Sequence, residues 1–184
     1  MPGLPPQIGD VAVIAYLPGD LARFLRSLTE RLAPASPHPR PHLTVLPPRP
    51  APSLDTMLNL LHVTAREEAP FRIRMGGLAT FLPISEVLYL ELDYGQQDAH
   101  RLYQRLLQVF PTDAPRERFQ FHPHVTLAYG LPIGEVARLL PGFRDEWTQY
   151  SGPREAPLRD LTLVRMSAPG QWDDIATFPL CGHQ

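Results

Sequence analysis

Two short segments of this 184-residue chain carry nearly the same residues in the same order. The first is PHLTV at residues 41–45, and the second is PHVTL at residues 123–127. An imidazole titrates near neutral pH, so one histidine can take up a proton while another releases one. A threonine hydroxyl can donate a hydrogen bond to a phosphate oxygen. Two histidines and two hydroxyls around one centre therefore suit phosphoryl chemistry, which in this form needs neither a metal nor a covalent intermediate.

The spacing within each segment favours a β-strand with its two polar side chains on one face. Residues i and i+2 of a strand point to the same side. His42 then shares a face with Thr44, and His124 shares a face with Thr126, while the aliphatic residues between them point into apolar packing. We predict that both pairs line one functional cleft.

A third His-x-Thr copy, HVT at residues 62–64, gives a useful comparison. It lacks the preceding proline and falls in a segment with helical periodicity, where residues i and i+2 do not share a face. We expect His62 at the edge of an amphipathic helix and Thr64 on its surface. A bare His-x-Thr is thus a weak signal, and the matched flanks and positions of the other two copies carry the prediction.

Hydrophobic periodicity predicts the order strand–helix–strand–helix–strand twice, over roughly 11–82 and 86–167. In the first half we expect a strand at 11–17, a helix capped by Asp20, a strand at 42–46 ended by Pro47-Pro48, a helix capped by Ser53, and a strand at 71–82 bulged at Gly76-Gly77. In the second half we expect a strand at 86–94, a helix at 96–110, a loop at 111–118, a strand at 118–130, a helix at 134–140, irregular structure at 141–157, and closing strands at 158–167 and 175–180.

This order predicts an α+β fold with two pseudo-symmetric lobes of mostly antiparallel sheet, outer helices and the active cleft between the lobes. We expect residues 1–184 to form a single bilobal domain whose lobes share one core. The 23 prolines mostly separate the periodic segments, so they are interpreted as loop punctuation and not as disorder.

The amino-acid composition limits the binding partners and the cellular compartment that we expect for this protein. The chain has 17 Lys and Arg against 19 Asp and Glu, a formal charge of −2, which argues against a protein that coats long nucleic acid. A nucleotide or one RNA end stays open as a partner. The one cysteine, Cys181, excludes an internal disulfide framework and favours a reducing, cytoplasmic setting. We see no signal peptide and no apolar stretch of membrane-spanning length, and nothing demands more than a monomer.

The two motifs and their flanks resemble the two-histidine (2H) phosphoesterase superfamily, which includes LigT-like "2'-5' RNA ligase" proteins and cyclic phosphodiesterases. The matching residues are HLTV at 42–45 and HVTL at 124–127, within PHLTVL and FHPHVTLAYG, and the likeness extends over roughly 8–181. It implies a bilobal fold with the active cleft between the lobes. It also implies that His42 and His124 are the general acid and base, and that Thr44 and Thr126 bind the phosphate.

The reaction implied by this resemblance is hydrolysis of a 2',3'-cyclic phosphate on a nucleotide or at an RNA end, without a cofactor. Some members act on a cyclic phosphate of ADP-ribose, and LigT-type members can also join RNA ends in reverse. Members close to LigT tend to carry arginine after the second motif, where this chain has Tyr129. On strict alternation Tyr129 faces away from His124, so packing is at least as good an interpretation of this residue as a contact with substrate.

Two other hypotheses for the same residues stay open. A metal hydrolase could use His38, His42, His122 and His124, although no carboxylate lies close to them in the sequence. A non-catalytic RNA- or nucleotide-binding protein could keep the cleft without turnover. Lesser candidates are His122 at the cleft rim, phenylalanines that could stack on a base, and arginines that could bind phosphate. The phenylalanines are Phe81, Phe119 and Phe121, and the arginines are Arg40, Arg49, Arg72, Arg74, Arg116 and Arg118.

Overall fold

The computed structural model describes residues 6–37, 39–51, 53–110 and 120–182. In these ranges the strands are β1 (Val11–Tyr16), β2 (His42–Arg49), β3 (Phe71–Thr80), β4 (Leu88–Tyr94), β5 (His124–Ala128), β6 (Glu155–Leu158), β7 (Asp160–Ala168) and β8 (Gln171–Pro179). The helices in the same ranges are α1 (Gly19–Leu32), α2 (Leu54–Glu67), α3 (Gln96–Val109) and α4 (Glu135–Gln149).

The strands form one curled sheet with the order β6-β3-β4-β5-β2-β1-β7-β8, and every neighbouring pair is antiparallel. The predicted α+β class is confirmed. The lobes do not coincide with the two sequence halves, however, because strands are exchanged between them. β3 of the first half pairs with β4 of the second, and β7 of the second half pairs with β1 of the first.

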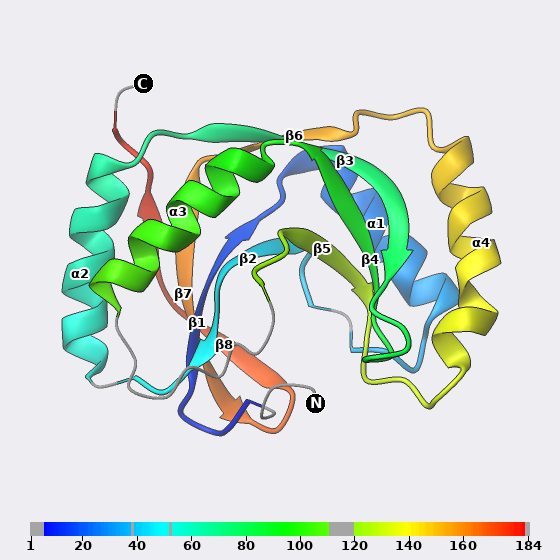
Figure 1. The fold of residues 1–184 in the computed structure, drawn as a ribbon, viewed down its shortest axis with the longest axis horizontal. Coiled ribbons are helices and arrows are strands. Elements are labelled where there is room, and N and C mark those ends of the chain that lie inside the picture. The colour runs from blue at the N-terminus through cyan, green and yellow to red at the C-terminus, as the bar shows by residue number, and fades with distance from the viewer. Residues whose placement is uncertain (1–5, 38, 52, 111–119, 183–184) are drawn as a thin grey trace.

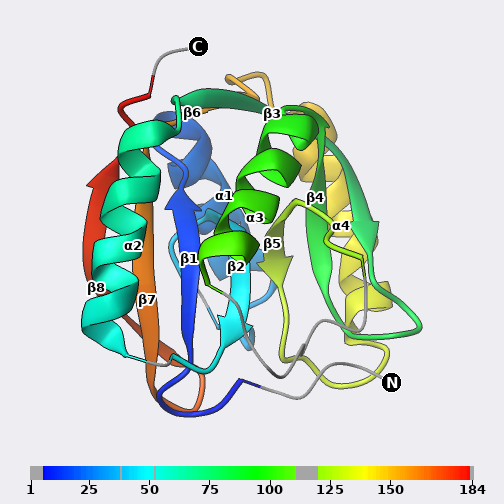
Figure 2. The same ribbon diagram turned by 60° about the vertical axis from the view of Figure 1, so that its left-hand side comes forward.

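The helices are exchanged in the same way. Figure 1 shows α2 and α3 together on one side and α1 and α4 on the other, in line with the contacts within each pair, and in Figure 2 α2 and α4 lie on opposite sides of the molecule. The strand order places β2 and β5 at the middle of the sheet, where the two lobes join. A single cluster of buried side chains runs through both lobes on the helix-covered face, and it includes Leu43 of β2 and Val125 of β5, both fully buried.

Several element boundaries in the first half differ from the expectation, and those of β2 and α1 have a local cause. β2 continues through Pro47-Pro48 to Arg49, because its pairing with β1 shifts register there and a bulge tolerates residues without an N–H donor. Helix α1 begins at Gly19 with Pro18 at the N-cap, so Asp20 lies in the first turn, where its charge still favours the helix dipole. Ser53 caps α2 as predicted and accepts a hydrogen bond from the Thr56 N–H at 3.4 Å.

Differences in the second half are larger. Helix α4 continues through Pro141, since Val136, Leu139, Phe143 and Trp147 keep one apolar face buried along its whole length. The Glu86 carboxylate supports its start by accepting hydrogen bonds from the N–H groups of Gly134 and Val136. The stretch expected to be irregular, 141–157, thus holds most of α4 and the start of β6. β5 is shorter than expected, and the predicted 111–118 loop lies outside the described residues.

The bulge predicted at Gly76-Gly77 is confirmed, because the β3–β4 register shifts on both sides of Met75. No helix in the described part of the chain is long and apolar enough to cross a membrane.

Candidate active site

The two His-x-Thr motifs meet because their strands are neighbours in one sheet. β2 and β5 pair through Leu43 and Val125, and both side chains point into the core. Since the strands are antiparallel about this pair, His42 comes level with Thr126, and Thr44 comes level with His124. Residues level across such strands have Cβ atoms about 4.5–5.5 Å apart, and diagonal neighbours are about 7–8 Å apart. The two histidines therefore lie diagonally across a compact group of four side chains.

All four predicted residues line one open cleft of about 750 Å³. The cleft lies on the face of β2 and β5 opposite the main core. The other residues that line it in the described chain are Pro6, Ala12, Ile14, Tyr16, Pro39, Arg40, Pro48, Phe81, Val87, Tyr129, Val164, Trp172, Asp173 and Asp174. Such a volume accommodates a nucleotide-sized ligand.

Each imidazole is held by a backbone carbonyl two residues before it. The His42 Nδ1 lies 2.7 Å from the Arg40 carbonyl oxygen, and the His124 Nδ1 lies 2.6 Å from the His122 carbonyl oxygen. A carbonyl oxygen can only accept, so Nδ1 carries the hydrogen in both rings. In the neutral ring Nε2 then has a free lone pair, and both histidines are oriented to exchange a proton through Nε2.

Burial lowers the pKa of both histidines, because desolvation disfavours the charged imidazolium. The pKa of His124 falls to about 4, and the neighbouring His122 and His42 rings contribute to the shift. The pKa of His42 is also below its ordinary value of 6.5, but the Asp174 carboxylate opposes the shift by favouring the imidazolium. The two rings are thus geometrically alike and electrostatically different.

Aromatic rings surround His124. The Phe81 ring stacks on Tyr89 with centroids 4.2 Å apart, and the Phe81 and Tyr89 centroids lie 5.0 and 4.9 Å from that of His124. The exposed His122 ring lies 6.2 Å from that of His124, and it is not among the residues that line the cleft. The His124 side chain is buried beside the Phe81 and Tyr89 rings, and this burial lowers its pKa by desolvation. Of the other phenylalanine candidates, Phe121 stacks on Tyr103, and Phe119 lies outside the described residues.

Charged side chains lie beside His42. Tyr16 is the β1 residue paired with His42, and its hydroxyl donates a hydrogen bond to Asp174 Oδ1 at 2.5 Å. The Arg40 guanidinium carbon lies 3.7 Å from the centre of the Tyr16 ring. Sequence reasoning missed Tyr16, Trp172 and Asp174, because only the pairing of β1 and β7 with their neighbours brings β8 to this cleft.

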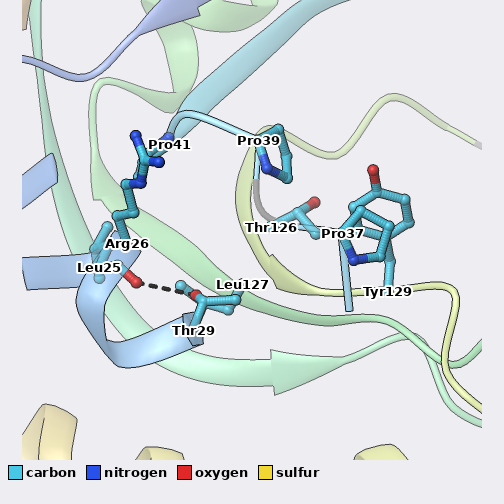
Figure 3. A pocket seen from close by; sticks show the side chains of 9 residues that line it. All are labelled: Leu25, Arg26, Thr29, Pro37, Pro39, Pro41, Thr126, Leu127 and Tyr129. Carbon is cyan, nitrogen blue, oxygen red and sulfur yellow. Dashed lines mark hydrogen bonds between the residues drawn. The ribbon is translucent and has the colours of Figure 1, made fainter. Parts of the chain in front are cut away.

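The expected orientation of Tyr129 is wrong. One extra β5 residue is inserted opposite Leu88 and Tyr89, so the alternation inverts after Thr126 and Tyr129 lines the cleft. The Ser36 hydroxyl fixes this end of β5, since it accepts a hydrogen bond from the Tyr129 N–H and lies 3.0 Å from the Tyr129 carbonyl oxygen. Figure 3 shows a small hollow beside this end of β5, and the residues that line it include Pro37, Pro39, Thr126 and Tyr129.

The third copy lies in helix α2, away from the cleft, as predicted. The His62 ring approaches Phe178 edge-on, with centroids 6.1 Å apart. Thr64 is not on the surface: it is 1 % exposed, and its hydroxyl donates to the Leu60 carbonyl oxygen at 2.9 Å. A hydroxyl bonded within its own helix is not available to a ligand.

Arg40 is the one candidate arginine found to line the cleft. Arg49 is buried and donates to backbone carbonyls, while Arg72 and Arg74 form ion pairs with acidic side chains of β4 and β6. Arg116 and Arg118 lie outside the described residues, as does His38 of the metal hypothesis. Among the residues that are described, no group of three or more His, Cys, Asp or Glu side chains is arranged to hold a metal ion.

The sequence is similar to a known protein family and to individual known proteins. Residues 17–169 match the sequence model of the 2'-5' RNA ligase superfamily. A Bacillus cereus (strain B4264) protein named "Putative phosphoesterase" is 27% identical over 142 residues, which cover 76% of this chain and 78% of that protein.

Solved structures share the fold. TT0787 of Thermus thermophilus superposes with a TM-score of 0.70 at 23% identity, over 95% of this chain and 100% of that one. LigT of E. coli complexed with 3'-AMP superposes with a TM-score of 0.63 at 16% identity, over 95% of this chain and 98% of that one.

Proposed function

Because the chain belongs to the 2'-5' RNA ligase superfamily, we propose that it is a metal-independent phosphoesterase. Its substrate is a 2',3'-cyclic phosphate on a nucleotide or at an RNA end, and its product is a phosphomonoester. The observation that carries this proposal is the diagonal placement of two like-oriented imidazoles, each level with a threonine hydroxyl, on the floor of one cleft.

The roles of the two histidines follow from their surroundings. His124 lies among aromatic rings and is neutral at pH 7, so its Nε2 takes a proton from the attacking water. His42 lies near Asp174, whose charge favours the imidazolium, so it donates a proton to the leaving ribose oxygen. Water adds to phosphorus as one ribose P–O bond breaks, and one proton moves through each ring. Thr44 and Thr126 donate hydrogen bonds to the phosphate oxygens.

The pH dependence of kcat/KM for 2',3'-cyclic AMP should be bell-shaped, with its maximum below pH 6.5. Below about 4 His124 takes a proton and can no longer act as a base. Because the His42 pKa is lowered from 6.5, the proton needed by the acid is lost before neutral pH. A bound anionic phosphate favours both imidazolium forms, so the kcat profile should lie at higher pH than the kcat/KM profile. A kcat/KM maximum above pH 7 would contradict this assignment.

Nucleotide binding can be measured apart from turnover by tryptophan fluorescence. Trp172 lines the cleft, whereas Trp147 is buried and donates its indole N–H to the Gly76 carbonyl oxygen. We expect 3'-AMP to change the fluorescence of the wild type, because a bound nucleotide alters the surroundings of Trp172 alone. The Trp172→Phe variant, which keeps Trp147, should lose this change. An equal response from both proteins would place the nucleotide outside this cleft.

A further inference from the structure

Arg40 is the one lysine or arginine among the described residues that line the cleft. The described charges beside it are the carboxylates of Asp173 and Asp174. Hydrolysis of a phosphodiester builds negative charge on the non-bridging oxygens, and positively charged groups stabilise that charge far better than neutral donors. The threonine hydroxyls and the neutral imidazole of His124 carry no formal charge. Arg40 is therefore the side chain in this cleft best suited to that need.

The Arg40 side chain is restrained but not fully engaged. Its guanidinium stacks on the Tyr16 ring, and its Nη1 lies 3.6 Å from Asp174 Oδ2. This separation exceeds a hydrogen bond, for which N···O distances are about 2.7–3.2 Å. The side chain is also 60% exposed. Asp174 meanwhile is held by the Tyr16 hydroxyl, so the carboxylate stays in place if the guanidinium moves.

The backbone of Arg40 is tied to the reaction centre. Its carbonyl oxygen accepts the His42 Nδ1–H, and Tyr16, the residue beneath its guanidinium, is paired with His42 across β1 and β2. The guanidinium and the imidazole thus both lie against the Tyr16 ring, with the His42 centroid 6.1 Å from that of Tyr16, and a planar fork of N–H donors matches two oxygens of a phosphate.

We propose that Arg40 is the phosphate-contacting cation of this cleft, and that Asp174 competes with the substrate phosphate for its guanidinium. On binding, Arg40 exchanges its long contact with Asp174 for hydrogen bonds to two non-bridging oxygens, while the Tyr16 ring keeps the guanidinium plane in the cleft. The proposal rests on the proposed function, since it names the residue that recognises the phosphate of that same reaction.

If Asp174 competes with phosphate for Arg40, substitutions of these two residues should have opposite effects on phosphate binding. Arg40→Gln should weaken inhibition by inorganic phosphate by roughly 10–100-fold, with a loss of similar size in kcat/KM for 2',3'-cyclic AMP. Arg40→Lys should lie between it and the wild type, because the charge remains but the planar fork does not. Asp174→Asn should tighten phosphate severalfold. Phosphate binding is compared at pH 8, where the lowered pKa values leave both histidines neutral, so an altered His42 pKa does not contribute, and kcat/KM is compared at the maximum of each variant's own pH profile.

Arg72 provides the matched control. It is an exposed arginine that pairs with Glu155 at 3.1 Å and does not line the cleft. Arg72→Gln should leave phosphate inhibition unchanged. Thermal unfolding of each variant shows whether the fold is retained, and Arg40→Lys keeps the test decisive if Arg40→Gln does not fold.

The outcomes separate the roles of this pair. If Arg40→Gln and Asp174→Asn both weaken phosphate binding, Asp174 merely anchors Arg40 and competition is refuted. If Arg40→Gln and Arg40→Lys bind phosphate like the wild type, Arg40 does not contact it. Calorimetric titration of phosphate decides the same question without turnover, so a wild type that binds phosphate but cleaves no cyclic phosphate would refute the proposed function alone. A wild type that does neither would refute both.

Discussion

Asparagine in place of either His42 or His124 should lower kcat for cyclic-phosphate hydrolysis by about 10²–10⁴-fold. Its side-chain amide can keep the hydrogen bond that Nδ1 makes to the backbone carbonyl, but it has no counterpart of Nε2 and cannot exchange the proton. Because the cleft keeps its shape, binding of 3'-AMP should change by less than about tenfold. The two measurements are single-turnover rates and the Trp172 fluorescence titration.

The double variant gives a sharper result. General acid and base act on the same transition state, so removing both should cost little more than removing one. His62→Asn is the matched control, because His62 belongs to the third His-x-Thr copy and lies on helix α2 away from the cleft. Loss of nucleotide binding in parallel with loss of turnover would indicate that the histidines hold the ligand, as in a non-catalytic binding protein.

Valine in place of Thr44 or Thr126 should lower kcat/KM by about 10–10²-fold each, because valine keeps the β-branched shape and removes the hydrogen-bond donor. Both side chains are partly exposed on the cleft face, so the fold should be retained. The loss should appear mainly in kcat if the hydroxyls contact oxygens that gain charge in the transition state. Thr64→Val tests the same change at a hydroxyl bonded within its own helix, and activity should not change there. Unaltered kinetics in both cleft variants would remove the threonines from the mechanism.

The central pair of strands could be predicted from sequence because its information is local. Alternation placed His42 and Thr44 on one face and Leu43 on the other, and the structure agrees. The repeated flanks also indicated membership of the two-histidine phosphoesterases, which the family match confirms. Alternation along one strand does not show which other strand pairs with it. The motifs were expected to face each other from two lobes, and they lie side by side in one sheet because β2 pairs with β5.

The rest of the cleft depends on contacts between distant parts of the chain. Asp174 reaches His42 through the β1–β7–β8 pairing, and no local pattern marks that strand as part of the site. Alternation predicts the wrong face for Tyr129, because a single inserted residue in β5 inverts the pattern. Helix α4 extends beyond the predicted 134–140, because its apolar stripe continues past Pro141 to Trp147. Such features are set by packing, which overrides local preference.

Metal-independent hydrolysis of a cyclic phosphate is tested most directly by ³¹P NMR of 2',3'-cyclic AMP mixed with the wild-type protein, with and without EDTA. The predicted result is that the cyclic-phosphate signal is replaced by one phosphomonoester signal, at a rate that EDTA does not change. The position of that signal also identifies the bond that breaks, as a 2'- or a 3'-phosphate. A cyclic-phosphate signal that persists with a folded protein, or a conversion that EDTA abolishes, would contradict a metal-independent two-histidine phosphoesterase.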